Sequence, residues 1–303
     1  MSAFTDKVLE ATKKAIVDGR PRPQVPEPLY HFTDVTALKA IVTTRKIRAS
    51  LATSLNDASE GSYGLTLALR MLRERSIEEG SYEDMLVNVI ESPTSLPGFL
   101  QYDMFPLVVC FCASNDTSSQ WMHYGRSGRG VAIGFNPKSL EQVTGLALWK
   151  IDYDLVSQRR RIQAVIDAGR AVFESDKQAV QSDLGVGAMT AAHVVWLQLR
   201  LLAAELKHPS FSCEDEWRLL GHEVSSSGKL LSNEASSKGP IEHRISDDGR
   251  LVPYKDLPLP DSEDVIASVV LGYSSSLDIN AVKLLLLDRT LRARVLRSEV
   301  PVR

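Results

Sequence analysis

The clearest hydrophobic pattern lies near the N-terminus, where a short apolar run is followed at once by a helical repeat. Residues 29–33 (LYHFT) form the apolar run and end in polar residues. Residues 35–42 then carry apolar side chains at helical spacing, and residues 47–50 return to a β-like pattern. This order predicts a strand, a helix and a second strand, a unit that presents His31 and Thr33 at the edge of a cleft.

The same segment also has a purely structural interpretation. His31 is then a core histidine whose ring is hydrogen-bonded by a neighbour. Thr33 or Asp34 then acts only as the N-cap of the following helix. The segment alone leaves both interpretations open.

Helical and β-like patterns continue along the chain. Helical spacing predicts an N-terminal helix that ends at Gly19, and four prolines between residues 21 and 28 predict a stiff extended connector. Further helices are expected at 63–79, 120–124, 159 onward, 189–207 and 278–286. Further strands are expected at 106–113, 131–135, 146–153, 211–220, 265–271 and 293–296.

Strands and helices interleave without a strict βαβ rhythm, which favours an α+β fold with a mixed or antiparallel central sheet. We predict an N-terminal helix and connector over residues 1–28 and one α+β domain over residues 29–303. The helical stretch near 155–207 is expected to be an insertion in this domain. Residues 225–248 are rich in Ser, Gly and Lys, which predicts an exposed, partly mobile loop.

Composition narrows the class of protein. The net charge of −3 and the pI of about 6.1 provide no global field toward DNA or anionic lipid, although a local basic patch is compatible with them. Three cysteines fit a reducing compartment rather than a disulfide framework. The chain shows neither a membrane-spanning run nor a signal-peptide pattern, so we expect a cytoplasmic protein. Its six histidines do not fall at metal-ligand spacing, and no metal is expected.

A second informative stretch is Phe211–Arg218. In a strand, Glu214, Glu216 and Arg218 share one face at about 7 Å spacing. Two neighbouring carboxylates repel each other, which raises one pKa and suits acid/base or charge-stabilising chemistry in a cleft. The alternative is a solvated sheet face with cross-strand ion pairs of little energetic value.

A third stretch, residues 114–135, combines aromatic residues with glycines. Trp121 and Tyr124 lie three residues apart and form a potential aromatic wall for a planar ligand. The glycines beside Arg126 and Arg129 would let a phosphate approach the backbone. Because the order is helix, glycines, strand, the dinucleotide fingerprint is not matched, and turn glycines with a core tryptophan are the alternative.

Taken together, these pieces resemble the bacterial family known as DUF2971. The resemblance rests on residues 29–33 and 55–60, on the 112–135 block with Trp121, Tyr124 and Gly130, on residues 214–218 and on the closing residues 296–303. It extends from about residue 28 onward. This family carries no settled activity.

A looser resemblance concerns chemistry, because residues 30–33, the next helix and a strand ending in Ser50 are similar to the first motif of ADP-ribosyltransferases. The likeness implies an ADP-ribosyltransferase-like fold that holds NAD as a substrate. It implies that His31 binds the adenosine-side ribose and that Thr33 orients the nicotinamide end. Tyr63 or Tyr124 would stack on nicotinamide, and Glu216 or Glu214 would stabilise an oxocarbenium-like transition state.

The resulting prediction is an NAD-consuming ADP-ribosyltransferase or NAD glycohydrolase, such as a toxin or phage-defence effector. Its predicted site residues are the catalytic Glu216, Glu214 and His31, with Tyr30, His31, Thr33, Ser50, Tyr63, Trp121, Tyr124 and Arg218 binding NAD. The acceptor of the ADP-ribose group would be a protein, a nucleic acid or water. We expect no membrane among the binding partners.

Two alternatives belong to other classes. One is a non-catalytic nucleotide- or ligand-sensing domain that uses a cleft of His31, Trp121 and Arg218. The other is a nucleic-acid-processing enzyme with Arg126, Arg129 and Arg159–Arg161 as one phosphate-facing surface. The enzyme hypothesis requires His31 to converge with Glu214 or Glu216 in one cleft.

Overall fold

A computed structural model describes residues 3–55, 62–75, 77–92, 102–143, 146–176, 184–226, 229–231, 239–246 and 249–301. Its helices are α1 (Ala3–Asp18), α2 (Val35–Thr44), α3 (Tyr63–Arg73), α4 (Tyr82–Glu91), α5 (Ser118–His123), α6 (Pro137–Leu140), α7 (Leu155–Ser175), α8 (Leu184–Ala203) and α9 (Ile279–Leu287). Its strands are β1 (Leu29–Thr33), β2 (Lys46–Leu51), β3 (Tyr102–Cys112), β4 (Val131–Phe135), β5 (Ala147–Lys150), β6 (Glu216–Ser226), β7 (Lys229–Leu231), β8 (Glu242–Ile245), β9 (Leu251–Pro258), β10 (Ile266–Leu271) and β11 (Arg294–Arg297).

The described strands form one sheet with the order β11-β10-β4-β1-β3-β2-β9-β8. From this row, β6 pairs with the full length of β3 and also with β5 and β7. All of these pairings are antiparallel except that of β10 with β11. The predicted α+β class with a mixed or antiparallel central sheet is therefore confirmed, and the observed sheet is mostly antiparallel.

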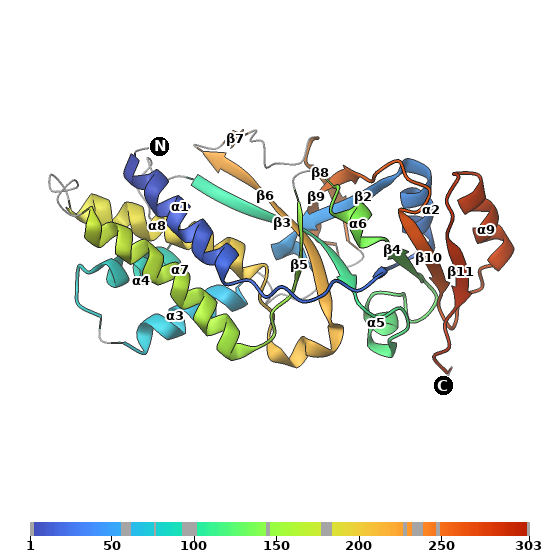
Figure 1. The fold of residues 1–303 in the computed structure, drawn as a ribbon, viewed down its shortest axis with the longest axis horizontal. Helices are drawn as coiled ribbons and strands as arrows, with labels where there is room; N and C mark the ends of the chain where they lie inside the picture. Colours follow the sequence, from blue (N-terminus) through green and yellow to red (C-terminus); the bar gives the residue numbers. More distant parts are fainter. Residues whose placement is uncertain are drawn as a thin grey trace.

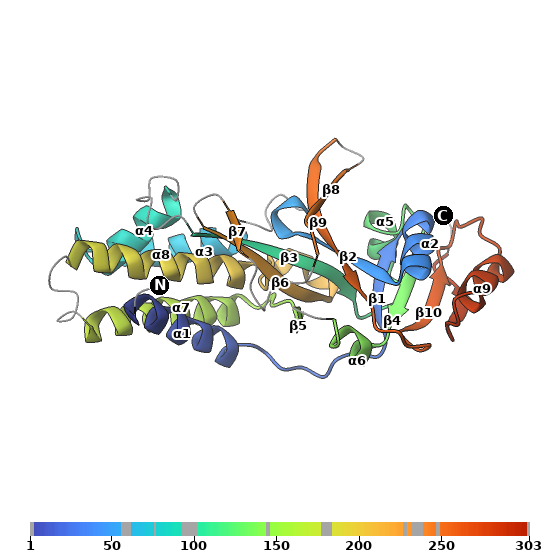
Figure 2. The ribbon, with the colours of Figure 1, turned by 90° about the horizontal axis from the view of Figure 1, so that it is seen from above.

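The hydrophobic residues divide into a sheet core and a helical core. The sheet core lies on one face of the sheet and takes in apolar residues of α2, α6 and α9. The helical core joins α1, α3, α4, α7 and α8. Figure 1 shows these five helices gathered at one end of the elongated molecule, with α2 and α9 at the other. The view from above shows β3 and β6 running from the helical end into the rest of the sheet (Figure 2).

The helices begin where the sequence supplies caps. Asp34 accepts a hydrogen bond from the Ala37 amide at the start of α2, and Asp154 accepts one from the Ser157 amide at the start of α7. Such caps satisfy amides that lack partners in the first helical turn. The helices predicted near 155–207 are present as α7 and α8, and they pack against α1, α3 and α4. The division of the chain into domains stays a prediction.

Several predicted elements differ from the structure in their bounds or type. The strand expected at 211–220 begins only at Glu216, because Pro209–Glu214 is a 3₁₀ helix that ends in the left-handed residue Asp215. The helix expected at 63–79 ends at Arg73. The loop expected at 225–248 includes, within its described part, the end of β6 together with β7 and β8.

Besides β7 and β8, the helices α4 and α6 and the strand β9 were not predicted. The helix α4 carries an N-cap at Ser81 and buries Tyr82, Leu86 and Val89. The strand β9 buries Val252 and Tyr254 on alternate positions. Of the motif at 55–60, residues 56–60 lie outside the described residues, as do residues 302 and 303 of the closing motif.

Candidate functional site

The centre of the candidate site is an ion pair between two residues on the same face of β6. Arg218 donates from Nε to Oε1 of Glu216 at 2.7 Å and from Nη2 to Oε2 at 2.8 Å. Arg218 also donates to the Ala204 carbonyl at 3.1 Å. A bidentate pair of this kind fixes both side chains, because the guanidinium fork matches the carboxylate. Sequence alternation had placed these two residues on one face, and the structure confirms it.

Lys207 and Glu214 complete this arrangement, which we call the β6 ion cluster (Lys207, Glu214, Glu216 and Arg218). The Lys207 Nζ lies 2.5 Å from Glu214 Oε2 and 3.3 Å from Glu216 Oε2. The Lys207 side chain is 3% exposed and that of Glu214 is 12% exposed. Two cations thus face two carboxylates in a nearly buried site, with Glu214 at its more open edge.

The charges of the cluster control the ionisation of Glu216. Burial on its own raises the pKa of this carboxyl, but Arg218 and Lys207 outweigh burial and lower the pKa to about 2. The Cys110 thiol donates a further hydrogen bond to Glu216 that acts in the same direction. Glu216 is therefore a carboxylate at neutral pH, with both oxygens engaged by cations.

Tyr124 connects the ion cluster to an aromatic cluster on the same side of the sheet. Its hydroxyl donates to Glu214 Oε1 at 3.2 Å, and its ring packs against the apolar cluster that contains Tyr30, Phe32 and Trp121. Burial raises the pKa of the Tyr124 hydroxyl well above its ordinary value, with the Glu214 charge adding to the effect. The hydroxyl thus stays protonated and holds Glu214 in place.

Trp121 is a core residue rather than an open aromatic wall. Its side chain is fully buried, its ring meets the Phe32 ring edge-to-face at 4.8 Å between centroids, and its Nε1 donates to Asp116 at 2.6 Å. The prediction that Trp121 stacks on a planar ligand is therefore wrong, because the fully buried ring leaves no face for a ligand. The alternative of a core tryptophan holds, because no face of the ring is open to solvent.

His31 does not join the β6 ion cluster. Tyr30 lies opposite Cys112, and Cys112 lies opposite Glu216, so these three side chains share one face of the sheet. As the neighbour of Tyr30 on the strand, His31 points to the other face, where its ring contacts that of Phe111. The predicted convergence of His31 with Glu216 is not observed.

On that face, His31 has the features of a structural histidine. Its Nδ1 donates to the Cys110 carbonyl at 2.9 Å. Burial lowers the pKa of His31, although this hydrogen bond works against the shift. The ring is therefore neutral at physiological pH and fixed in the sheet, as the structural interpretation of the segment had it.

The other predicted NAD-binding residues are dispersed. Thr33 shares the face of His31, whereas Tyr30 and the buried Ser50 share the face of Glu216. Tyr63 stands at the start of α3, where its hydroxyl donates to Gln158 at 2.7 Å. The structure therefore brings together Glu214, Glu216, Arg218 and Tyr124, and places Tyr63 in a second polar cluster.

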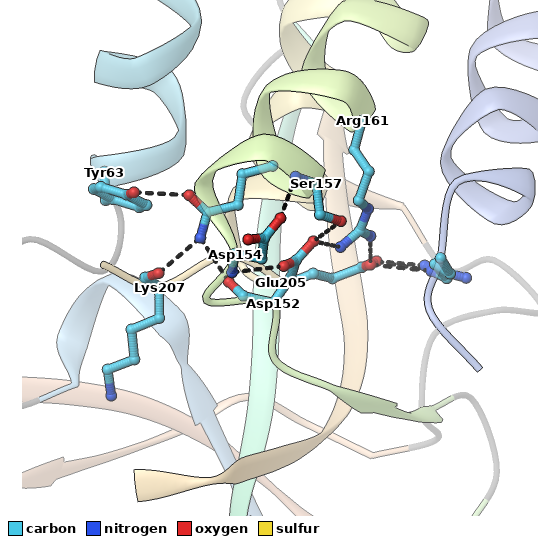
Figure 3. Close-up of polar contacts among 9 residues, drawn as sticks. Tyr63, Asp152, Asp154, Ser157, Arg161, Glu205 and Lys207 are labelled. Atoms are coloured by element: carbon cyan, nitrogen blue, oxygen red, sulfur yellow. Dashed lines mark hydrogen bonds and ion pairs between the residues drawn. The ribbon is translucent and has the colours of Figure 1, made fainter. Parts of the chain in front are cut away.

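This second cluster surrounds Arg161, which is 1% exposed (Figure 3). The guanidinium of Arg161 pairs with Glu205 and, at 3.4 Å, with Asp152. Arg20 adds a second cation at 2.5 Å from Glu205. The Gln158 amide donates to the carbonyls of Asp152 and Lys207, which joins the two clusters through the backbone. Figure 3 shows the Lys207 side chain directed away from Glu205.

Lys207 is not among the predicted site residues, and Arg161 does not lie on the surface where the sequence predicts it. Arg161 was expected on a phosphate-facing surface, but the structure buries it between Asp152 and Glu205. The sequence does carry a signal that Arg161 is buried. Its position on α7 continues a helical stripe of buried residues that also includes Gln158, Ile162 and Val165. Arg126 lies elsewhere and pairs with Asp34 at 3.2 Å, so the predicted arginine surface is not continuous.

The described part of the chain contains no group of three or more His, Cys, Asp or Glu side chains that could hold a metal ion. One described helix segment, Gly185–Ala203 in α8, has the length and hydropathy of a membrane span, but 72% of it is buried inside the protein. Such burial is typical of a helix in a protein core.

Fold and site together define an α+β protein with a mostly antiparallel sheet and a charge-balanced ion cluster at its centre. Residues 120–219 match the model of a family described as protein of unknown function (DUF2971). The predicted resemblance to this family is thus confirmed over a segment that begins in α5 and ends in β6. The matched segment contains Tyr124, Lys207, Glu214, Glu216 and Arg218. No curated protein and no solved structure matches the chain.

Proposed function

We propose that this chain cleaves the nicotinamide–ribose bond of NAD, as an ADP-ribosyltransferase or an NAD glycohydrolase. The observation that supports the proposal is the position of the Glu214 carboxylate at the open edge of the β6 ion cluster, next to the Tyr124 ring. The proposal also rests on the likeness of Glu214-Asp215-Glu216 to the E-x-E form of some ADP-ribosyltransferases. An effector role, as a toxin or in phage defence, would follow from the loss of cellular NAD.

The chemistry requires a fixed carboxylate more than it requires a metal. When the C–N bond breaks, its electron pair leaves with nicotinamide and the ribose carbon becomes cationic. A carboxylate held within reach stabilises that charge. Water, or a hydroxyl or amine of an acceptor, then attacks the ribose carbon and gives up a proton, for which Glu214 is the nearest base in the cluster.

Glu214 is a better candidate for this role than Glu216. Glu216 is paired with two cations, Arg218 and Lys207, which together cancel the charge that would stabilise an oxocarbenium ion. Glu214 is paired with one cation, Lys207, and its other oxygen accepts from the neutral Tyr124 hydroxyl, so it keeps more negative charge. Glu216 therefore acts as a positioning residue, because it holds the Lys207 ammonium that in turn holds Glu214. His31 has no role in this site, since it faces the other side of the sheet.

The test is to incubate the pure chain with NAD and to follow free nicotinamide by chromatography, with and without cell extract. Glu214→Gln should abolish release, because the amide keeps the shape and loses the charge. Glu263→Gln, at an exposed pair with Arg292, is the matched control and should leave release unchanged. Release that persists in Glu214→Gln, or no release from the unchanged chain, would overturn the proposal.

A second candidate function is non-catalytic binding of a nucleotide. It is favoured by the fact that Tyr124 and Lys207 already occupy the two oxygens of Glu214. Calorimetric titration with NAD separates the two candidates. Saturable binding that is weakened in Glu214→Gln, without nicotinamide release, would establish the sensing function in place of the enzyme.

A further inference from the structure

A second surface, on the helical end of the molecule, gathers arginines from two neighbouring helices. On α3, Thr66, Arg70 and Arg73 follow one face at spacings of four and three residues, and Arg75 follows the helix end. On α7, Arg159 and Arg160 lie in the first turns. Since α3 and α7 are packed against each other, these five arginines line a common depression.

The depression consists of two adjoining hollows. One is lined by Thr66, Leu69, Arg70, Arg73 and Glu74. The other is lined by Met71, Glu74, Arg75, Arg159, Arg160 and Gln163. Glu74 belongs to both and stands between them. We call this surface the arginine groove (Arg70, Arg73, Arg75, Arg159 and Arg160).

The groove keeps an excess of positive charge. Among the described contacts of these arginines are two carboxylates, since Glu74 pairs with Arg159 and Glu91 pairs with Arg73. Arg75 is held by the neutral side chain of Gln163. Exposed pairs of this type contribute little to stability, so a ligand with several negative charges can replace Glu74 and Glu91 at small cost.

We propose that the arginine groove binds the phosphate groups of a nucleotide-sized oligophosphate. Arginine forks bind phosphate oxygens in pairs, and five such forks in two adjoining hollows match a chain of two or three phosphates better than a lone phosphate. The groove shares no residue with the β6 ion cluster, so this proposal stands independently of NAD cleavage.

The experiment is calorimetric titration of the full chain with inorganic tripolyphosphate at low and at moderate salt. The test variant is Arg70→Gln with Arg160→Gln, which leaves the pairs of Arg159 and Arg73 intact. The matched control is Arg292→Gln with Arg294→Gln at the opposite end of the molecule, near α9 (Figure 1). Circular dichroism confirms that each variant is folded.

The expected result is saturable binding that weakens with salt and falls about tenfold or more in the test variant, while the control variant binds like the unchanged chain. Absence of binding at low salt, or equal weakening in both variants, would overturn the proposal. A fluorescent 20-mer single strand is titrated in parallel. If the strand binds far more tightly than tripolyphosphate, and the test variant loses that binding, the groove binds nucleic acid. The proposal of a nucleotide-sized ligand is then wrong.

Discussion

Arg218 and Glu216 lie two residues apart on β6 and join through two parallel hydrogen bonds of 2.7 and 2.8 Å in a site that excludes solvent. Neither charge is tolerable there without the other, because taking an ion out of water costs several kcal/mol. The Arg218–Glu216 pair therefore contributes both to the stability of the fold and to the geometry of the candidate site. Lys207 and Glu214 form a further pair of mutually dependent charges nearer the surface. There the Tyr124 hydroxyl holds the carboxylate of Glu214.

Replacing Arg218 with methionine should strongly destabilise the fold. The change leaves the Glu216 carboxylate buried with Lys207 as its remaining cation, and such losses typically lower the free energy of unfolding by about 3–5 kcal/mol. Denaturant unfolding measures the difference. Arg292→Met, at an exposed ion pair with Glu263, should stay within about 1 kcal/mol of the unchanged chain. Equal effects of the two changes would contradict the assignment of a structural role to the Arg218–Glu216 pair.

Much of the fold could be predicted because the spacing of apolar residues indicates which segments form helices and which form strands. The strand β1, the helix α2 and the strand β2 follow from one uninterrupted pattern, and β4 and β10 are short apolar runs between turn residues. The start of β6 could not be predicted in this way. There, Pro209 and the left-handed Asp215 stop the strand pattern before Glu216, although the residue types still alternate.

The candidate site could be predicted only in part, because its members come from distant parts of the chain. Glu216 and Arg218 follow from strand alternation. Lys207 belongs to the turn after α8, and only the folded chain brings its Nζ between the two glutamates. The face on which His31 lies depends on the register of β1 against β3, which a single sequence does not reveal.

Stability should fall as the pH drops below about 6.5, in part because of His31. Burial lowers the pKa of His31 in the folded chain, so the ring stays neutral while the unfolded chain takes up a proton near its ordinary pKa. The stabilisation is therefore complete above pH 6.5 and is lost as the pH falls, by at most about 1.4 kcal/mol per pH unit.

His31→Gln keeps a donor for the Cys110 carbonyl and removes the titration. It should flatten the decline of unfolding free energy between pH 6.5 and 5. Burial also lowers the pKa of His222, which adds to the decline in both proteins, so the difference between them isolates His31. Nicotinamide release or NAD binding should be unchanged in this variant, because His31 faces away from Glu214. An unaltered pH slope would show that His31 titrates alike in the folded and unfolded chain.

The Arg161 cluster should anchor the N-terminal segment to the helical layer. Arg161→Met leaves Glu205 and Asp152 without their fully buried cation and should lower the free energy of unfolding by about 3–5 kcal/mol. Arg20→Met should cost less, because Arg20 is 17% exposed and Arg161 still pairs with Glu205. Denaturant unfolding gives the free energy of unfolding of both variants. A larger decrease of this free energy in Arg20→Met than in Arg161→Met would contradict the prediction.

Gly130 is required by the close approach of two backbone segments. A Cβ atom at this position would lie 2.2 Å from the Thr33 carbonyl oxygen, which belongs to the central strand β1 and cannot move aside. At Gly134 a Cβ atom would instead meet the Ser268 hydroxyl at 2.6 Å and the Tyr30 ring at 2.8 Å, and both are side chains that can shift. Overpacking usually costs about 1–3 kcal/mol, and we expect Gly134→Ala in this range and Gly130→Ala above it.

The same substitution reports on the candidate site. The turn that ends at Gly130 also fixes α5, since the Gly130 amide donates to the Gly125 carbonyl at 2.9 Å and Gly125 packs on Trp121. A displaced turn would move Tyr124 away from Glu214, so Gly130→Ala should weaken NAD turnover or binding more than Gly134→Ala does. Thermal unfolding and nicotinamide release, measured on both variants at a temperature where each is folded, test the two effects separately. Full activity in a destabilised Gly130→Ala chain would show that Tyr124 does not position Glu214.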